Sequence, residues 1–426
     1  MPGIYEMTKQ IKADSFLMSL LGGETRNQAL KAIAKGLLDQ KAQILEANQA
    51  DLTKAADSGL AAPIVKRLKF DEQKLNDVIC GIESLIGLPD PLRNNLLVRE
   101  LDSELTLYKV TCPIGVIGVI FESRPDALVQ IATLCLKSGN CAILKGGSEA
   151  ANTNKILFEI IHEAGVRSGV PDGFLTLVEN RAEIGELLKC HDTIDLLIPR
   201  GSNEFVQYIM SNSKIPVMGH ADGVCHVYAD ETADIEKAIP IIVDAKTQYV
   251  AACNATETLL VHRAVAPKLL PPLKKALDEK MVTVLGCPET RKLMPCEAAT
   301  EADYGKEYLD YTLSIRIVES LEEAISHINR YGSHHTDSII TEDRDSAEKF
   351  MLLVDSAGVY HNCSTRFADG YRYGFGAEVG ISTGKLHARG PVGLDGLVTY
   401  KYKLYGNGQI VGDYAEGRRS FHFRDL

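Results

Sequence analysis

Hydrophobic residues in the early part of the chain recur at helical spacing. Leu30, Ile33, Leu37 and Ile44 lie three, four and seven positions apart, which places them on one buried helix face. From residue 114 onward, short apolar runs alternate with amphipathic segments of helical period. The runs predict strands at residues 114–121, 141–145, 174–178 and 194–198, and the segments predict helices at residues 127–137, 149–167, 183–189 and 203–211. This alternation is typical of parallel βαβ units, so we expect an open α/β sheet that binds ligands at its strand carboxyl ends.

A second series of the same kind follows residue 230. The pattern predicts helices at residues 235–246, 321–329 and 345–354, and strands at residues 257–261 and 312–318. We therefore expect a second α/β domain. Residues 397–405 alternate like an exposed strand, and an exposed strand edge usually needs a partner.

Composition narrows the range of functions. The chain has 426 residues, of which 45% are hydrophobic and 24% charged, as expected of a globular protein with more than one domain. Its net charge of −11 comes without any basic block, which argues against a nucleic-acid partner. No apolar run reaches the roughly 18–20 residues of a membrane span, and residues 1–12 do not resemble a secretory signal. We expect a cytoplasmic protein that binds neither nucleic acid nor a membrane.

The ten cysteines are scattered and include no Cys-x-x-Cys pair. They predict neither a disulfide framework nor a structural zinc site, and most should be buried core residues. His220 and His226 flank Asp222 in a spacing that fits no common metal motif, so we expect no metal site. The pair His334-His335 is interpreted as loop surface.

One predicted strand ends in Lys145-Gly146-Gly147-Ser148 and leads directly into a helix. Two glycines let a ligand approach the backbone closely, and a helix N-terminus attracts anions. Together with the cation of Lys145, this combination suits a ribose phosphate. The alternative is an ordinary strand–helix turn with a surface lysine. The usual G-x-G-x-x-G dinucleotide fingerprint is missing.

Cys253 lies in the small-residue segment 251–255, between a predicted helix and a predicted strand. Small neighbours leave room for a substrate carbonyl and expose backbone N–H groups that stabilise a thiolate or an oxyanion. The alternative is a buried core cysteine. Ser123 and Arg124 follow a buried strand, at the edge where an open α/β sheet carries its functional groups. The alternative there is a capped turn that starts the next helix.

Six stretches together resemble the aldehyde dehydrogenase superfamily and, within it, the γ-glutamyl phosphate reductases. In the order of the family they read PIGVIGVIFESRP at 113–125, LKGGSEA at 144–150, IPRGS at 198–202, GHADGVCHVY at 219–228, CNATETLLVH at 253–262 and GFGAEVGISTGKLHARGP at 374–391. The resemblance covers most of the chain, and it strengthens the reading of Cys253 as a nucleophile.

The resemblance implies three parts. A Rossmann-type NADP(H)-binding domain is expected at residues 1–100 and 113–234, and an α/β catalytic domain at residues 235–390. Residues 101–112 and 391–426 are expected to form a β oligomerisation element and a C-terminal tail. The cofactor is expected to be NADPH/NADP. Its binding residues by resemblance are Lys145, Gly146, Gly147 and Ser148 at the adenosine ribose, Gly201 and Ser202 at the pyrophosphate, and Glu307 at the nicotinamide ribose.

The implied reaction reduces L-glutamyl 5-phosphate to L-glutamate 5-semialdehyde through a thioester on Cys253, the second step of proline biosynthesis. Asn254 adjoins the nucleophile, and Ser123 and Arg124 fall where hydrolytic relatives place an oxyanion-hole asparagine that this chain lacks. The water-activating glutamate of those relatives is also missing from residues 217–223. Without a positioned base, water is a poor nucleophile, which favours phosphate as the reaction partner.

Arg124, Lys385, His387 and Arg389 are the predicted phosphate-binding residues. The last three stand at alternate positions, so an extended chain would point them the same way. The alternative is a solvated basic face.

Competing functions are a hydrolytic or coenzyme-A-acylating aldehyde dehydrogenase and, from a different class, an inactive scaffold subunit on the same fold. The expected partners are the acyl phosphate substrate, further copies of this chain and, transiently, glutamate 5-kinase.

Overall fold

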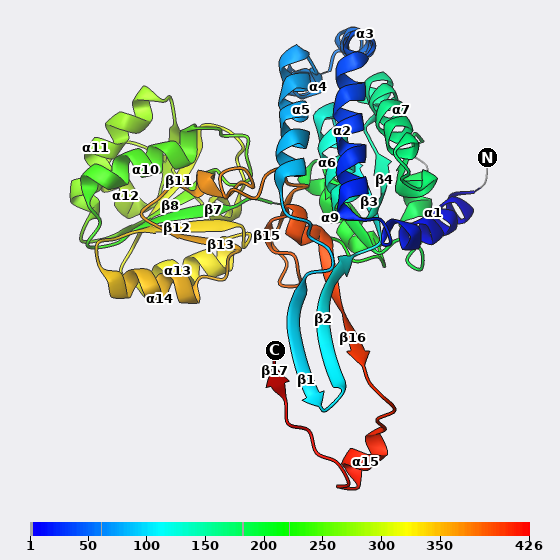
Figure 1. The fold of residues 1–426 in the computed structure, drawn as a ribbon. Helices are drawn as coiled ribbons and strands as arrows, with labels where there is room; N and C mark the ends of the chain where they lie inside the picture. The colour runs from blue at the N-terminus through cyan, green and yellow to red at the C-terminus, as the bar shows by residue number, and fades with distance from the viewer. Residues whose placement is uncertain (1–2, 61, 181–182, 221) are drawn as a thin grey trace.

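The computed structural model describes residues 3–60, 62–180, 183–220 and 222–426. Two α/β bodies stand side by side, and a long β arm extends away from them (Figure 1). The predicted α/β fold class is confirmed. Within the described ranges, no helix is both long enough and apolar enough to cross a bilayer.

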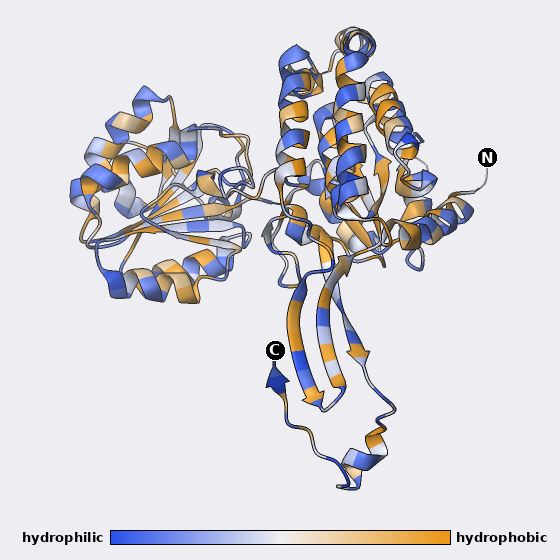
Figure 2. Ribbon diagram, in the orientation of Figure 1, coloured by the Kyte–Doolittle hydropathy of each residue, from blue (hydrophilic) through white to orange (hydrophobic). Residues whose placement is uncertain are grey.

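The first body holds a four-stranded parallel sheet in the order β5-β4-β3-β6. Helices cover it on both sides, and their hydrophobic stripes face inward (Figure 2). The strands are β3 (Val116–Phe121), β4 (Cys141–Lys145), β5 (Leu175–Leu177) and β6 (Leu196–Arg200). The helices are α1 (Ile4–Met18), α2 (Gly23–Asp39), α3 (Lys41–Asp57), α4 (Ala62–Leu68), α5 (Glu72–Gly87), α6 (Pro125–Lys137), α7 (Ala151–Arg167), α8 (Glu183–Leu187) and α9 (Asn203–Asn212).

The segment from β3 to β4 shows how the sequence specifies this sheet. Every residue of β3 is buried, as a strand covered on both faces requires. Pro125 starts α6 at a position where its missing N–H costs nothing. Gly139, with φ of +72°, then ends the helix and turns the chain back into β4.

The second body is built on a seven-stranded parallel sheet in the order β10-β9-β11-β8-β7-β12-β13. Its strands are β7 (Cys225–Ala229), β8 (Thr256–His262), β9 (Thr283–Gly286), β10 (Glu297–Ala298), β11 (Thr312–Val318), β12 (Thr336–Ile340) and β13 (Gly358–His361). Its helices are α10 (Ile235–Thr247), α11 (Ala266–Glu279), α12 (Pro288–Leu293), α13 (Leu321–Tyr331) and α14 (Arg344–Leu353). Two separate apolar cores lie on the two sides of this sheet.

The arm is an antiparallel sheet in the order β16-β2-β1-β17. It consists of β1 (Asn95–Asp102), β2 (Leu105–Pro113), β16 (Val398–Tyr405) and β17 (Arg424–Asp425), with the short helix α15 (Val411–Ala415) near its far end (Figure 1). β16 pairs with β2 along its whole length, from Val398 opposite Pro113 to Tyr405 opposite Thr106. The predicted strand at residues 397–405 is therefore confirmed.

Three domain boundaries differ from the sequence prediction. β7 lies in the second sheet, so the change of body comes before Cys225 and not after Asp234. Val379 and Val392 pack in the core of the first body, which means that the glycine-rich segment returns there after the second body is complete. The arm begins at Asn95 instead of residue 101. The predicted boundaries divide the chain in sequence order, whereas each of these segments is placed by the partners it packs against.

Candidate active site

A cavity of about 910 Å³ opens where the two bodies meet. Its walls include the carboxyl ends of β3 and β6 in the first body, as predicted for an open α/β sheet. The second body contributes the segments that precede β7 and β8, at the amino ends of these strands. The predicted site residues that line this cavity are Ser123, Arg124, Gly201, Ser202, Cys253, Asn254 and Glu307.

Cys253 contacts a histidine that the sequence did not reveal. The Sγ atom lies 3.2 Å from Nε2 of His335, and Nδ1 of that ring is 2.9 Å from the Thr336 hydroxyl oxygen. His335 is fully buried. The interpretation of His334-His335 as loop surface is therefore wrong for His335, which precedes β12 directly and points to the thiol. An imidazole at this distance can take up the thiol proton.

The loop that carries Cys253 is held by its neighbours. The side-chain amide of Asn254 donates to the Ala368 carbonyl at 2.8 Å, and the Thr365 hydroxyl donates to the Asn254 carbonyl at 2.7 Å. A Cβ atom on Gly223 would lie 2.1 Å from the Cys253 carbonyl oxygen. Only glycine therefore lets the segment before β7 pass so close. Asn254 contacts the backbone of another loop, so it positions the nucleophile.

His220 lies on the other side of His335. The two rings meet edge to face with centroids 4.8 Å apart, and Nδ1 of His220 is 2.8 Å from the Ile381 carbonyl oxygen. Burial lowers the pKa of His220, which favours the neutral ring. His220 belongs to the stretch in which hydrolytic relatives carry their glutamate. Ala221, also in that stretch, lies outside the described residues.

The cations of the cavity differ from the predicted set. Lys385 and Arg389 both form ion pairs with Asp355, and the exposed His387, like them, is absent from the residues that line the cavity. The guanidinium groups that line the cavity are those of Arg67, Arg124, Arg200 and Arg366.

Polar contacts hold Arg200 and Arg366 in the wall of the cavity that Cys253 lines. Nη1 of Arg200 donates to the Val379 carbonyl at 2.6 Å, and Nε of Arg366 donates to the Gln248 side chain at 2.9 Å. Burial lowers the pKa of both arginines, while the Cys253 sulfur raises it. Both arginines line the same cavity as Cys253.

Ser123 donates two hydrogen bonds to a carboxylate. Its backbone N–H and its hydroxyl both donate to Oε1 of Glu149, each at 2.7 Å. Ser123 also has a φ of +48°, which is uncommon for a residue with a side chain. The contact ties the end of β3 to the turn after β4. Ser123 thus shapes the cavity wall, and its hydroxyl proton is already used.

The predicted cofactor residues form two groups. Ser202 caps α9, whose N-terminus faces the cavity beside Gly201, and Asn203 donates to Glu307 at 2.8 Å. Burial raises the pKa of Glu307. At the end of β4, the buried Lys145 donates to the Gly146 carbonyl at 2.5 Å.

The group of residues that follows β4 is tightly packed. A Cβ atom on Gly146 would lie 2.2 Å from the Asn154 side chain, and Oδ1 of Asn154 is buried without a hydrogen-bond partner among the described residues. A helix N-terminus, two glycines and an unsatisfied buried oxygen fit a dinucleotide that carries phosphates and riboses.

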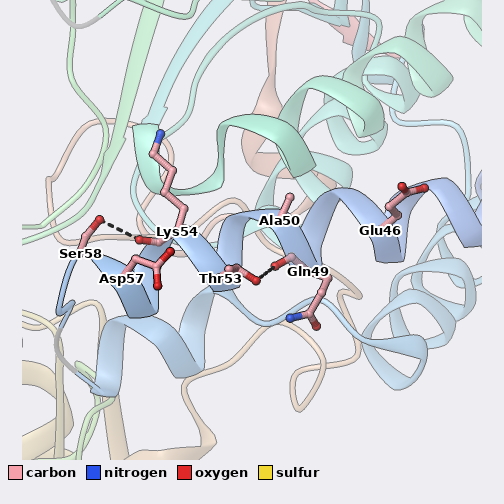
Figure 3. A pocket seen from close by; sticks show the side chains of 7 residues that line it. All are labelled: Glu46, Gln49, Ala50, Thr53, Lys54, Asp57 and Ser58. Atoms are coloured by element: carbon pink, nitrogen blue, oxygen red, sulfur yellow. Dashed lines mark hydrogen bonds between the residues drawn. The ribbon is translucent and has the colours of Figure 1, made fainter.

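A second hollow lies far from this chemistry. It runs along one helix, α3, and its cap (Figure 3). Its lining residues are Glu46, Gln49, Ala50, Thr53, Lys54, Asp57 and Ser58. A groove on one helix, without a thiol or an imidazole, offers no reacting group. The cavity around Cys253 is therefore the candidate active site.

Comparisons with known proteins agree with this choice of site. Residues 26–295 match the model of the aldehyde dehydrogenase family. The chain is 62% identical over 418 residues to the γ-glutamyl phosphate reductase of Acetivibrio thermocellus, which covers 98% of this chain and 97% of that one. It is 59% identical over 421 residues to the γ-glutamyl phosphate reductase of Pelotomaculum thermopropionicum, with 99% and 97% covered. The crystal structure of γ-glutamyl phosphate reductase from Thermotoga maritima superposes with a TM-score of 0.93 at 39% identity, and covers 95% of this chain and 99% of that one.

Proposed function

The chain belongs to the aldehyde dehydrogenase family and, within it, to the γ-glutamyl phosphate reductases of proline biosynthesis; we propose that it reduces L-glutamyl 5-phosphate through a thioester on Cys253, with NADPH as the hydride donor. The observation that carries the proposal is the contact between the Cys253 sulfur and His335, in a cavity that the predicted cofactor residues Gly201, Ser202 and Glu307 also line.

The first step forms the thioester. Nε2 of His335 accepts the thiol proton while the sulfur attacks the γ-carbonyl carbon. The bond between that carbon and the phosphate oxygen then breaks, and phosphate leaves with the electron pair. The backbone N–H of Cys253 stabilises the transient oxyanion. Arg124, Arg200 and Arg366 supply positive charge for the phosphate. The sequence had assigned this role to Arg124 together with Lys385, His387 and Arg389, so only Arg124 is kept from that set.

The second step reduces the thioester. When bound, the nicotinamide cofactor supplies the hydride that the thioester carbon accepts. The oxygen of the resulting thiohemiacetal then re-forms a carbonyl, the carbon–sulfur bond breaks, and glutamate 5-semialdehyde leaves. His335 returns its proton to the Cys253 thiolate, which restores the starting state. Glu307 and the N-terminus of α9 line the same cavity as Cys253 and would hold the cofactor there.

The choice of NADPH over NADH rests on Lys145. The lysine cation at the end of β4 favours a ribose that carries an extra phosphate. The glycines that follow it let that ribose approach the backbone.

We further propose that the protein acts in the cytoplasm as a homo-oligomer that assembles through the β arm. The outer strand β16 exposes Tyr400, Tyr402 and Leu404 at alternate positions of one face. A transient contact with glutamate 5-kinase would shorten the path of a labile acyl phosphate.

Replacing Cys253 with Ala tests the proposed nucleophile. We expect turnover to be lost while NADPH binding and the melting temperature stay unchanged, because the sulfur takes part in the reaction only. Loss of turnover is measured by NADPH oxidation, and NADPH binding by fluorescence titration. The matched control is Cys80→Ser, which removes an exposed thiol and should keep full activity. Substantial reduction by Cys253→Ala would overturn the thioester route.

A further inference from the structure

Three ligand atoms of the kind that bind zinc meet at the nucleophile. One nitrogen of His220, the Cys253 sulfur and one nitrogen of His335 all lie within 4.8 Å of one another. The three residues come from segments far apart in the sequence. They precede β7, β8 and β12, which are neighbours in the second sheet, so the amino ends of parallel strands bring them together. A motif search along the chain misses such a set.

We propose that His220, Cys253 and His335 form a reversible binding site for a thiophilic divalent cation, with Zn²⁺ as the best match, and that a bound ion blocks the nucleophile. Cysteine sulfur and histidine nitrogen are both zinc ligands, and zinc sites in enzymes hold the ion by three protein ligands with an open fourth position. The inference concerns binding, so it stands independently of the substrate proposed above.

The distances fit with little movement. Tetrahedral zinc holds its nitrogen and sulfur ligands at about 2.0–2.3 Å, which separates neighbouring ligands by about 3.3–3.8 Å. The sulfur and Nε2 of His335 are already 3.2 Å apart, and the largest separation in the cluster does not exceed 4.8 Å.

In both His220 and His335, a partner of Nδ1 orients the imidazole ring. Nδ1 of His220 faces the Ile381 carbonyl at 2.8 Å, and Nδ1 of His335 faces the Thr336 hydroxyl at 2.9 Å. When Nδ1 carries the hydrogen, the other nitrogen of each ring keeps its lone pair, and that of His335 already lies 3.2 Å from the sulfur. Metal-binding histidines are commonly fixed in this way by a hydrogen bond to their second nitrogen.

The ion would enter from the cavity side. His220 and Cys253 both line the cavity, so the fourth position is open to water or substrate. Binding forms a zinc–sulfur bond and releases the thiol proton to solvent, without electron transfer. A thiolate bound to zinc and an imidazole bound through its free nitrogen can neither attack a carbonyl nor accept a proton. Zinc should therefore compete with the acyl phosphate.

Equilibrium dialysis of the metal-free full chain against Zn²⁺ tests the site without substrate. We expect one ion per chain. Removing a residue that only hydrogen-bonds to a metal ligand lowers metal affinity by about 10–100-fold. Cys253→Ser and His220→Gln each remove a ligand, so each should lower the affinity by more than that. The matched controls are Cys80→Ser, an exposed thiol, and His334→Asn, whose ring contacts Asp355. Both should retain the affinity of the unaltered chain.

A second measurement does not depend on any variant. One equivalent of Zn²⁺ should protect Cys253 from alkylation by iodoacetamide, as mapped by peptide mass spectrometry, and leave Cys80 reactive. Co²⁺ in place of Zn²⁺ should produce a thiolate-to-metal absorption band. Equal alkylation of Cys253 with and without Zn²⁺, or undiminished zinc binding by Cys253→Ser, would overturn the proposal.

Discussion

At the residue scale, the proposed catalysis depends on the contact between His335 and Cys253. Replacing His335 with Asn should lower kcat/KM by about 10²–10⁴-fold near neutral pH, the usual contribution of a positioned base. The loss should shrink at high pH, where solvent deprotonates the thiol without help. The reductase rate and the rate of Cys253 alkylation, each followed against pH, measure this effect. His334→Asn is the neighbouring control, and equal pH profiles for both variants would exclude His335 as the base.

Residue chemistry could be predicted where one short segment carried it. The small neighbours of Cys253 gave a local signal, whereas Gly201 and Ser202 were indicated only by the family resemblance. Cys253, Gly201 and Ser202 all line the cavity. His335 gave none, because a polar pair between elements reads as loop surface and only the fold turns one ring inward. The predicted phosphate-binding role of the basic residues at 385–389 has a different weakness. Only Ile381–Ser382 and Gly390–Pro391 pair as strands there, and Asp355 attracts two of the cations.

At the element scale, a buried ion pair fastens the helix before Cys253 to the strand after it. Lys246 at the end of α10 lies 2.5 Å from Glu257 on β8, and both side chains are fully buried. Burial raises the pKa of Glu257 to about 7 and lowers that of Lys246. Lys246→Met should therefore lower the free energy of unfolding by about 3–5 kcal/mol, because it leaves a buried carboxyl group unpaired.

The double variant Lys246→Met with Glu257→Met should recover most of that loss, since replacing both partners with apolar groups removes the unpaired group. Urea unfolding followed by circular dichroism measures both variants. A double variant less stable than Lys246→Met alone would contradict the unpaired carboxyl group as the cause of the loss.

Helices and strands could be predicted where their hydrophobic residues recur at one regular spacing. The strands at 141–145 and 312–318 agree with β4 and β11 at both ends. α11 had no counterpart, because Pro271 and Pro272 lie inside it and proline normally argues against a helix interior. β12 and β13 were not predicted either. Polar residues fill part of β12, and β13 is only half-buried.

At the scale of the whole molecule, two α/β bodies and a β element were predictable, but their boundaries were not. Chain order puts Cys225 with the first body and Val379 with the second, whereas packing assigns each to the other. The active site depends on this exchange, because the returning segment carries Val379, whose carbonyl holds Arg200 at the cavity.

The exposed arm makes assembly testable. Asp in place of both Tyr402 and Leu404 should break the oligomer, because it puts charge on the outward face of the edge strand. Sedimentation velocity measures the mass. The control is Phe16→Asp, which changes an equally exposed residue on α1. An unchanged mass for the double variant would contradict assembly through β16.

The central claim is that phosphate, and not water, is the partner of the thioester. The most direct test is the reverse reaction, in which NADP⁺ is reduced by glutamate 5-semialdehyde with and without inorganic phosphate. We predict a rate that depends strictly on phosphate, with at most one equivalent of NADPH per Cys253 when phosphate is left out. Sustained turnover at equal rates in both conditions would mean that water cleaves the thioester, and it would contradict the account.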